Sequence, residues 1–194
     1  MSRPTGFRTT ATVFILLTAT LSGEAKSGWA GTPLERDRKE GVHPCDWTEF
    51  HARADREGLR IAYRCAETID FNRGAAYCVY LDTDGKRETG FRGGEDTFPI
   101  GAEYLLQGAT LYRYTGDGTA WSWTTEGAVG FDLAADWAEL TLSPALFKTS
   151  ADTLRVFLLG DNSAEGVGGT VVDEMPDGAL RAGGGGKFIR IKLR

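Results

Sequence analysis

The segment TLRVFLLGD (153–161) is the strongest apolar run beyond the N-terminal region of the chain, and it decides the fold class. Polar residues bound it at both ends, and its length suits a strand better than a helix. A continuous apolar run of this kind is typical of a strand that is buried on both faces. We therefore expect residues 153–161 to form a central strand of a sheet.

Further segments with strand character lie on both sides of this run. They are 46–54, 58–67, 75–82, 102–108, 109–115, 120–126, 127–134, 137–143, 169–175 and 187–194. Many of them alternate apolar and polar residues, as half-buried strands do, and most of the 26 glycines fall between them. In 187–194, either Phe188 faces inward, or Ile189 and Ile191 do.

Helical signals are scarce, which completes the fold class. Only SPALFK (143–148) predicts a short helical turn, with Ser143 as the cap and Pro144 at the first position. The loop RAGGGG (181–186) has almost no side chains to pack, so we expect it to be mobile. The pattern predicts one all-β domain over 45–194, a two-sheet antiparallel sandwich of jelly-roll type with about ten strands.

The N-terminal region is typical of a signal peptide over residues 1–30. Arg3 and Arg8 precede the apolar run ATVFILLTATL (11–21), and small residues place cleavage after Ala25 or Ala30. The run is short for a membrane span, although an uncleaved anchor is the alternative. Residues 31–44 predict a charged linker. We expect an exported protein, periplasmic or extracellular, with no membrane span once the signal is removed.

The charge of the chain excludes several partners. The net charge is −5, and it becomes more negative without residues 1–30, which carry three cations and one anion. Nucleic acid requires a basic face, so it is not expected as a partner. An acidic domain suits a neutral ligand, a cation or no ligand. The three cysteines, Cys45, Cys65 and Cys78, match no zinc spacing, and their odd number leaves at least one without an intrachain disulfide.

No catalytic pattern stands out. The chain has two histidines, His43 and His51, and neither has a serine or cysteine partner in a nucleophile motif. Acidic residues are numerous, but glycoside hydrolysis needs two of them at a defined separation in a cleft. We expect a non-catalytic protein.

The segment YLDTDGKRETG (80–90) offers the clearest candidate site. Asp82 and Asp84 lie at the end of a predicted strand, and Gly85 turns the chain. Ca²⁺ takes oxygen ligands, and paired carboxylates with loop carbonyls supply them. The alternative is an ordinary turn in which the aspartates accept local backbone N–H groups. The segment is not an EF-hand, since Lys86 stands at the third acidic position and no helices flank it.

Four segments together resemble exported bacterial domains of the family 9 carbohydrate-binding-module type, within the wider DOMON-like group. They are VYLDTDGKRETGF (79–91), IGAEYLLQGATLYRYTGDGTAWSW (100–123), AELTLSPALF (138–147) and FLLGDN (157–162). The resemblance covers about 45–194 and implies a jelly-roll sandwich with a structural Ca²⁺. Asp82 and Asp84 match the acidic pair of the family, and Glu103 stands where related domains have Asp.

The resemblance also implies sugar binding between aromatic rings. Trp121 and Trp123 share a strand face by alternation, and so do Tyr112 and Tyr114. Rings of this kind either pack in the core or form an exposed platform. Trp137 lies opposite the apolar face of its strand and is the better platform candidate by alternation. The ligand-binding candidates are Trp121, Trp123, Trp137 and Tyr112.

Two function classes follow from these features. One is a non-catalytic module that binds glycans and carries a structural calcium ion. The other is an exported structural or protein-interaction domain without a small ligand. The DOMON-like resemblance implies a third alternative, a haem domain, for which His43, His51 and Met175 are the available axial ligands.

Overall fold

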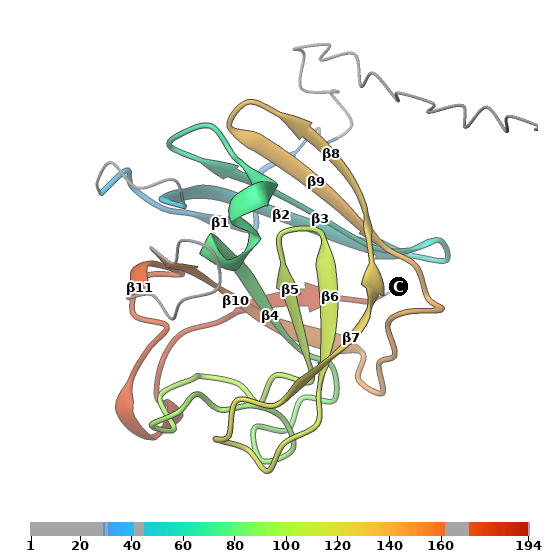
Figure 1. Cartoon of the computed structure of the whole chain (residues 1–194), viewed down its shortest axis with the longest axis vertical. Helices are drawn as coiled ribbons and strands as arrows, with labels where there is room; N and C mark the ends of the chain where they lie inside the picture. The colour runs from blue at the N-terminus through green and yellow to red at the C-terminus, as the bar shows by residue number, and fades with distance from the viewer. Residues whose placement is uncertain (1–28, 30, 41–44, 162–170, 194) are drawn as a thin grey trace, which may run out of the picture.

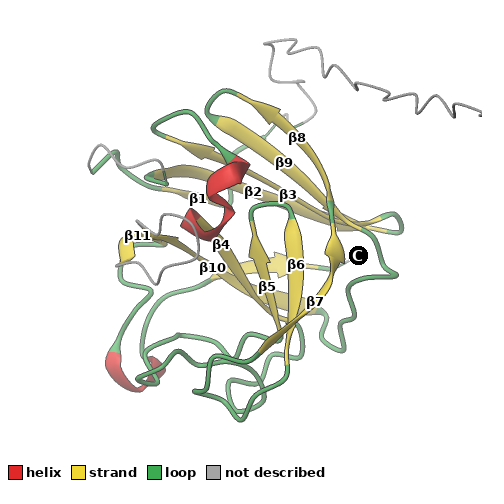
Figure 2. Cartoon of the chain, in the orientation of Figure 1, coloured by secondary structure: helices red, strands yellow, loops and turns green. Residues whose placement is uncertain are grey.

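The computed structural model describes residues 29, 31–40, 45–161 and 171–193. These residues form two antiparallel sheets with no closed barrel (Figures 1 and 2). The strands and the two 3-10 turns are β1 (Glu35–Arg36), β2 (Trp47–Asp55), β3 (Gly58–Cys65), η1 (Phe71–Ala76), β4 (Tyr77–Asp82), β5 (Tyr104–Gln107), β6 (Thr110–Tyr114), β7 (Trp123–Ala128), β8 (Gly130–Ala134), β9 (Trp137–Leu142), β10 (Thr153–Asp161), β11 (Val171–Met175), η2 (Ala182–Gly184) and β12 (Ile189–Lys192). The predicted all-β sandwich is confirmed.

The sheets differ in size and in how the chain enters them. We call sheet A the one with the order β1-β2-β3-β9-β8, and sheet B the one with the order β11-β10-β4-β5-β6-β7, in which β12 also pairs with β10. The chain crosses from β7 in sheet B to β8 in sheet A at Val129, whose N–H bonds the Ala109 carbonyl oxygen at 2.9 Å. Val129 is buried in the core between the sheets.

Strand β10 is central, as its apolar sequence predicts. It pairs with β4 on one side and with β11 and β12 on the other. Its side chains alternate between two apolar clusters. Leu154, Val156 and Leu158 lie in the core between the sheets, whereas Phe157 and Leu159 lie in a second cluster on the outer face of sheet B.

This second cluster gives sheet B an additional covering layer. The loop 83–103 contributes Phe91, Phe98 and Ile100 to it, and the segment after β11 contributes Ala179. All six residues of β4 are therefore buried, although only one face of the strand points into the sandwich. The covering loop follows Asp82, the last residue of β4, and ends at Glu103, so it positions the candidate site described below.

The structure bears on three predictions of local structure. The predicted short turn near 143–148 is present as a single turn over 144–146, in which the Leu146 N–H bonds the Ser143 carbonyl oxygen at 3.1 Å. The glycine loop 181–186 contains η2 and is tied to loop 83–103 by a 3.0 Å bond from the Arg181 N–H to the Thr97 carbonyl oxygen. The segment 31–44 is more than a linker, because β1 pairs with β2.

The C-terminal strand resolves one open alternative. Ile189 and Ile191 face inward in β12, and Arg190 and Lys192 face outward. Of the predicted signal segment 1–30, only Trp29 belongs to the described residues. In the described part of the chain, no helix has the length and apolar character needed to cross a membrane.

Candidate metal centre and aromatic face

The three predicted metal ligands lie together at one end of sheet B. Asp82 ends β4 and Glu103 precedes β5, and these strands pair with Leu81 opposite Tyr104. Pairing therefore places both carboxylates at the same end of neighbouring strands, with Asp84 on the loop between them. One oxygen from each of the three carboxylates lies within 4.8 Å of the others.

Asp82 is the most buried member of this acidic triad. Its side chain points to the outer face of sheet B, and the residue is 0% exposed because the covering loop closes over it. The Gly85 N–H donates to its Oδ1 at 2.6 Å. Among the described residues its Oδ2 accepts no hydrogen bond, and Arg155 Nη1 lies 3.6 Å from it. A buried carboxylate oxygen without a donor is costly to keep ionised.

Asp84 and Glu103 share one hydroxyl donor. Thr89 Oγ1 lies 3.0 Å from Asp84 Oδ2, 3.0 Å from Glu103 Oε1 and 2.9 Å from the Lys86 carbonyl oxygen. A hydroxyl has one proton, so it can donate to only one of these acceptors. The other oxygen of Glu103, Oε2, has a donor of its own, because it accepts the Thr83 N–H at 2.7 Å. Asp84 Oδ1 accepts the Lys86 N–H at 2.8 Å, as in an ordinary turn, and Glu103 Oε2 also accepts the Thr83 hydroxyl at 3.2 Å. The shortage of donors among the described residues therefore concerns Asp82 Oδ2 and the two oxygens that share the Thr89 proton.

Burial and the neighbouring negative charges raise the pKa values of Glu103 and Asp82. The pKa of Glu103 is raised from 4.5 to about 7, mainly by burial and also by the charges of Asp82 and Asp84, against the hydrogen bonds from Thr83 and Thr89. Burial also raises the pKa of Asp82, although the Gly85 N–H and the Arg155 charge lower it. Carboxylates in such surroundings gain from any nearby cation.

Two further oxygens adjoin the triad, and sequence reasoning missed both. The Thr89 hydroxyl lies within hydrogen-bonding distance of Asp84 and Glu103, and the Lys86 carbonyl oxygen lies 2.9 Å from that hydroxyl. Ca²⁺ takes six to eight oxygen ligands, carbonyls and hydroxyls among them. The side chain of Lys86 argues against a metal, but its backbone contributes the relevant atom. A loop carbonyl carries no sequence signal, so this ligand was not predictable.

Glycines hold the loop close to the strand that carries Glu103. A Cβ on Gly101 would lie 2.3 Å from the Arg87 carbonyl oxygen, and one on Gly90 would lie 2.4 Å from the Gly101 carbonyl carbon. These separations are far below normal contact distances, so neither position accepts a side chain without rearrangement. The two segments touch backbone to backbone beside the acidic triad.

An aromatic face lies on the same side of sheet B. We use this name for Tyr112, Trp121 and Trp123. Trp121 is 61% exposed, while Tyr112 and Trp123 are half-buried against the second cluster. Trp121 precedes β7 rather than lying in it, and its ring centroid is 5.7 Å from that of Trp123. With Leu105, Gln107 and Ser122, these rings line a hollow of about 360 Å³.

Trp137 is not an exposed platform, contrary to the expectation from alternation. It does point to the outer face of sheet A, but it is only 8% exposed. His51 packs edge-on against its ring at 5.4 Å between centroids, and the Arg64 guanidinium lies 5.4 Å from the ring centroid. Long polar side chains can cover an outer sheet face, and a pattern of alternation does not reveal this.

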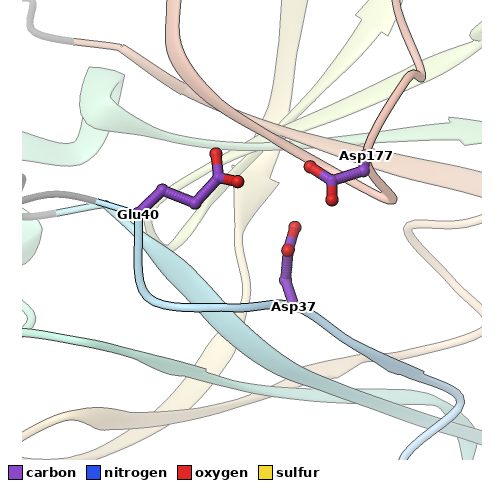
Figure 3. Close-up of side chains that lie close together, drawn as sticks. All are labelled: Asp37, Glu40 and Asp177. Atoms are coloured by element: carbon purple, nitrogen blue, oxygen red, sulfur yellow. The ribbon is translucent and has the colours of Figure 1, made fainter.

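A second acidic cluster lies at the edge of sheet A. Figure 3 shows the carboxylates of Asp37, Glu40 and Asp177 pointing toward one another. The pKa of Asp37 is raised to about 6, mainly by burial and also by the charges of Asp177 and Glu40, against a hydrogen bond from the Arg38 N–H. Glu40 and Asp177 are exposed, so solvent screens them. The triad around buried Asp82 is the stronger cation candidate.

Among the described residues, the remaining sequence candidates form no site. No disulfide joins the three cysteines, all of which are buried. Burial raises the pKa of the Cys45 and Cys78 thiols to about 12, so they stay protonated. Of the haem-ligand candidates, Met175 is 0% exposed and His51 packs against Trp137, while His43 lies outside the described residues.

Comparison with known proteins identifies no family. No protein-family model matches the chain, and no curated protein or solved structure is significantly similar to it. The resemblance to carbohydrate-binding modules therefore remains a prediction. What stands is a two-sheet antiparallel β-sandwich with acidic clusters that could hold a metal ion.

Proposed function

We propose that this domain binds one Ca²⁺ at Asp82, Asp84 and Glu103, and that the ion stabilises the fold. The supporting observation is the fully buried Asp82 carboxylate, which has two further carboxylates beside it and an oxygen without a hydrogen-bond donor among the described residues. The Lys86 carbonyl and the Thr89 hydroxyl add neutral oxygens. Hard-cation affinity depends on this charge and oxygen count.

Thermal unfolding in chelator and in Ca²⁺ tests this proposal. An ion that binds only the folded state stabilises it by about 2.7 kcal/mol at a hundredfold excess over Kd. We expect Tm to rise with Ca²⁺, Asp82→Ala to abolish the rise and Asp84→Ala to weaken it. Mg²⁺ should substitute poorly, because it requires a tighter octahedral geometry. The control is Glu88→Gln, an exposed acid in the same loop. A Tm that ignores both chelator and Ca²⁺ contradicts the proposal.

We further propose that the domain is a non-catalytic glycan-binding module, which uses the aromatic face. The exposed ring of Trp121 favours this function, because the C–H face of a pyranose packs on such a ring. Gln107 and Ser122 offer hydrogen bonds in the same hollow, and no charged side chain lines it. Gln107 and Tyr112 also line a neighbouring hollow of about 620 Å³. Asp70 also lines this second hollow and can accept sugar hydroxyl groups, so the two hollows together suit several sugar units in an uncharged chain.

Affinity electrophoresis through soluble neutral polysaccharides, such as β-glucan and xylan, tests the second function. We expect retardation of the wild-type protein and none for Trp121→Ala. Leu34→Ala is the control, since Leu34 is an exposed apolar residue outside the aromatic face. Equal mobility of wild type and Trp121→Ala in every polysaccharide contradicts glycan binding. That result favours the alternative, an interaction domain for a protein partner.

We also propose that the chain is exported, on the basis of its basic and apolar N-terminal sequence. Expression of the full chain followed by N-terminal sequencing tests this. A mature start near residue 26 or 31 is expected, and an intact Met1 in the cytosol contradicts export.

A further inference from the structure

The acidic triad and the aromatic face meet in one loop. Thr89, whose hydroxyl contacts both Asp84 and Glu103, is followed two residues later by Phe91. The ring of Phe91 is 3% exposed, and its centroid lies 5.5 Å from those of Trp121 and Trp123. A change in the position of Thr89 therefore reaches the tryptophans through one short backbone segment.

The opposite side of the triad leads to the same rings. Phe91 and Ala102 exchange two backbone hydrogen bonds of 2.9 Å each, and Ala102 directly precedes Glu103. The Glu103 carbonyl oxygen accepts the Tyr114 N–H at 2.8 Å. The ring of Tyr114 lies 5.1 Å from that of Trp123 between centroids. Both chain segments that carry the triad thus support the aromatic face.

Tyr114 also fixes the loop that carries Trp121. Its hydroxyl donates to the Ala120 carbonyl oxygen at 2.9 Å and accepts the Gly118 N–H at 2.8 Å. A third tie joins the covering loop to this one, since the Arg92 N–H bonds the Gly118 carbonyl oxygen at 2.7 Å. Trp121 is exposed, but the backbone that carries it is anchored to residues next to the triad.

The covering loop at Gly90 and the segment before β5 at Gly101 are in close backbone contact. The Gly90 and Gly101 backbones leave no room for a Cβ, so the loop cannot shift against the strand end without moving it. A cation at the triad would draw the oxygens of Asp84, Glu103 and Thr89 toward one point. Without it, the carboxylates repel one another and the Asp82 Oδ2 has no hydrogen-bond donor among the described residues.

We propose that occupancy of the triad by Ca²⁺ is coupled through Phe91 to the geometry of the aromatic face. The ion is then a regulator of that face as well as a structural element. This inference rests on the proposed Ca²⁺ binding. Coupling between two sites is reciprocal, and typical values change affinity by about 5-fold to 150-fold. We expect a ligand of the aromatic face to bind at least about 5-fold more tightly when Ca²⁺ is present.

Tryptophan fluorescence tests the coupling without a known ligand of the face. The full chain has five tryptophans, so the Trp121 contribution is obtained as the difference between wild type and Trp121→Phe. We expect Ca²⁺ to change the emission and acrylamide quenching of Trp121, with the half-saturation seen in the Tm titration. The control is Trp29→Phe, which should keep the change, since Trp29 bonds Glu139 and packs on His51, a residue of sheet A.

Phe91→Leu then tests the path. Leucine keeps the site apolar but removes the ring, so we expect the Tm rise with Ca²⁺ to persist and the Trp121 response to fall at least severalfold. A full Trp121 response in this variant overturns the path through Phe91. If the variant does not fold, the wild-type titration still decides. A Tm rise without any Trp121 response overturns the coupling and leaves Ca²⁺ binding intact. Absence of both overturns the coupling together with the proposed function.

Discussion

Glu103→Gln should stabilise the protein in chelator and destabilise it in Ca²⁺. The pKa of Glu103 is about 7 in the folded state, against 4.5 as the ordinary value. A raised acid pKa means that the folded state keeps a proton that the unfolded state has lost, so stability falls as pH rises from about 4.5 to 7. Glutamine does not titrate, and its amide oxygen can still accept the Thr83 N–H that Glu103 accepts now.

The magnitude follows from the two pKa values. At about 1.4 kcal/mol for each pKa unit, the difference between the two pKa values corresponds to about 3 kcal/mol in the free energy of unfolding. Partial solvent access lowers this contribution to between about 1 and 3 kcal/mol. In chelator, the advantage of Glu103→Gln should grow from near zero at about pH 4.5 to this value at about pH 8. At a thousandfold excess of Ca²⁺ over Kd, the wild-type protein gains about 4 kcal/mol, so the order should reverse.

Urea unfolding followed by fluorescence measures both states. Glu88→Gln makes the same charge change at an exposed position of the loop, and we expect it to alter stability little in either condition. If Glu103→Gln is less stable than wild type in chelator at about pH 8, the ionised Glu103 carboxylate does not destabilise the folded state. The electrostatic reasoning about the triad would then be wrong.

Four more substitutions probe other features. Urea titrations should show that Asp173→Asn reduces the loss of stability between about pH 4 and 7. The reason is that burial raises the pKa of Asp173 to about 7, against the hydrogen bonds from the Trp47 and Glu174 N–H groups. An unchanged dependence of stability on pH contradicts this prediction. Gly101→Ala should lower Tm and weaken the Ca²⁺ response, since its Cβ would lie 2.3 Å from the Arg87 carbonyl oxygen; wild-type Tm and response would disprove it. Trp47→Ala should lower the free energy of unfolding in urea by about 3–5 kcal/mol, because Trp47 is 0% exposed. Trp121→Ala should lower it by less than about 1 kcal/mol, because Trp121 is 61% exposed. Equal losses would refute the assignment of Trp47 to the core and of Trp121 to the surface.

Much of the fold was predictable because sheet periodicity is local. The run 153–161 became β10 with the same bounds, and the alternation of Leu59, Ile61 and Tyr63 matches the buried face of β3. The order of strands was not predictable, because pairings such as β3 with β9 depend on contacts between distant segments. The covering loop was also missed, since Phe91 and Phe98 lie outside any alternating run.

The candidate site shows the same division. Asp82 and Asp84 were recognisable from their spacing at a strand end, and Glu103 was named only through a family resemblance. The structure brings all three together. Thr89 and the Lys86 carbonyl have no signature in sequence. Trp137 was misjudged because alternation gives the face of a strand and does not reveal whether His51 and Arg64 cover that face.

The strand order bears on how quickly the chain can fold. Sheet A joins β3 to β9, and sheet B joins β4 to β10, so each sheet depends on pairing between strands that lie far apart in the sequence. The chain loses conformational entropy before the contacts between such distant strands form and stabilise it. For this reason, β-rich domains of this kind fold in about milliseconds to seconds. Neither sheet is complete until β9 and β10 have left the ribosome. Folding that waits for such distant pairings is compatible with the proposed export.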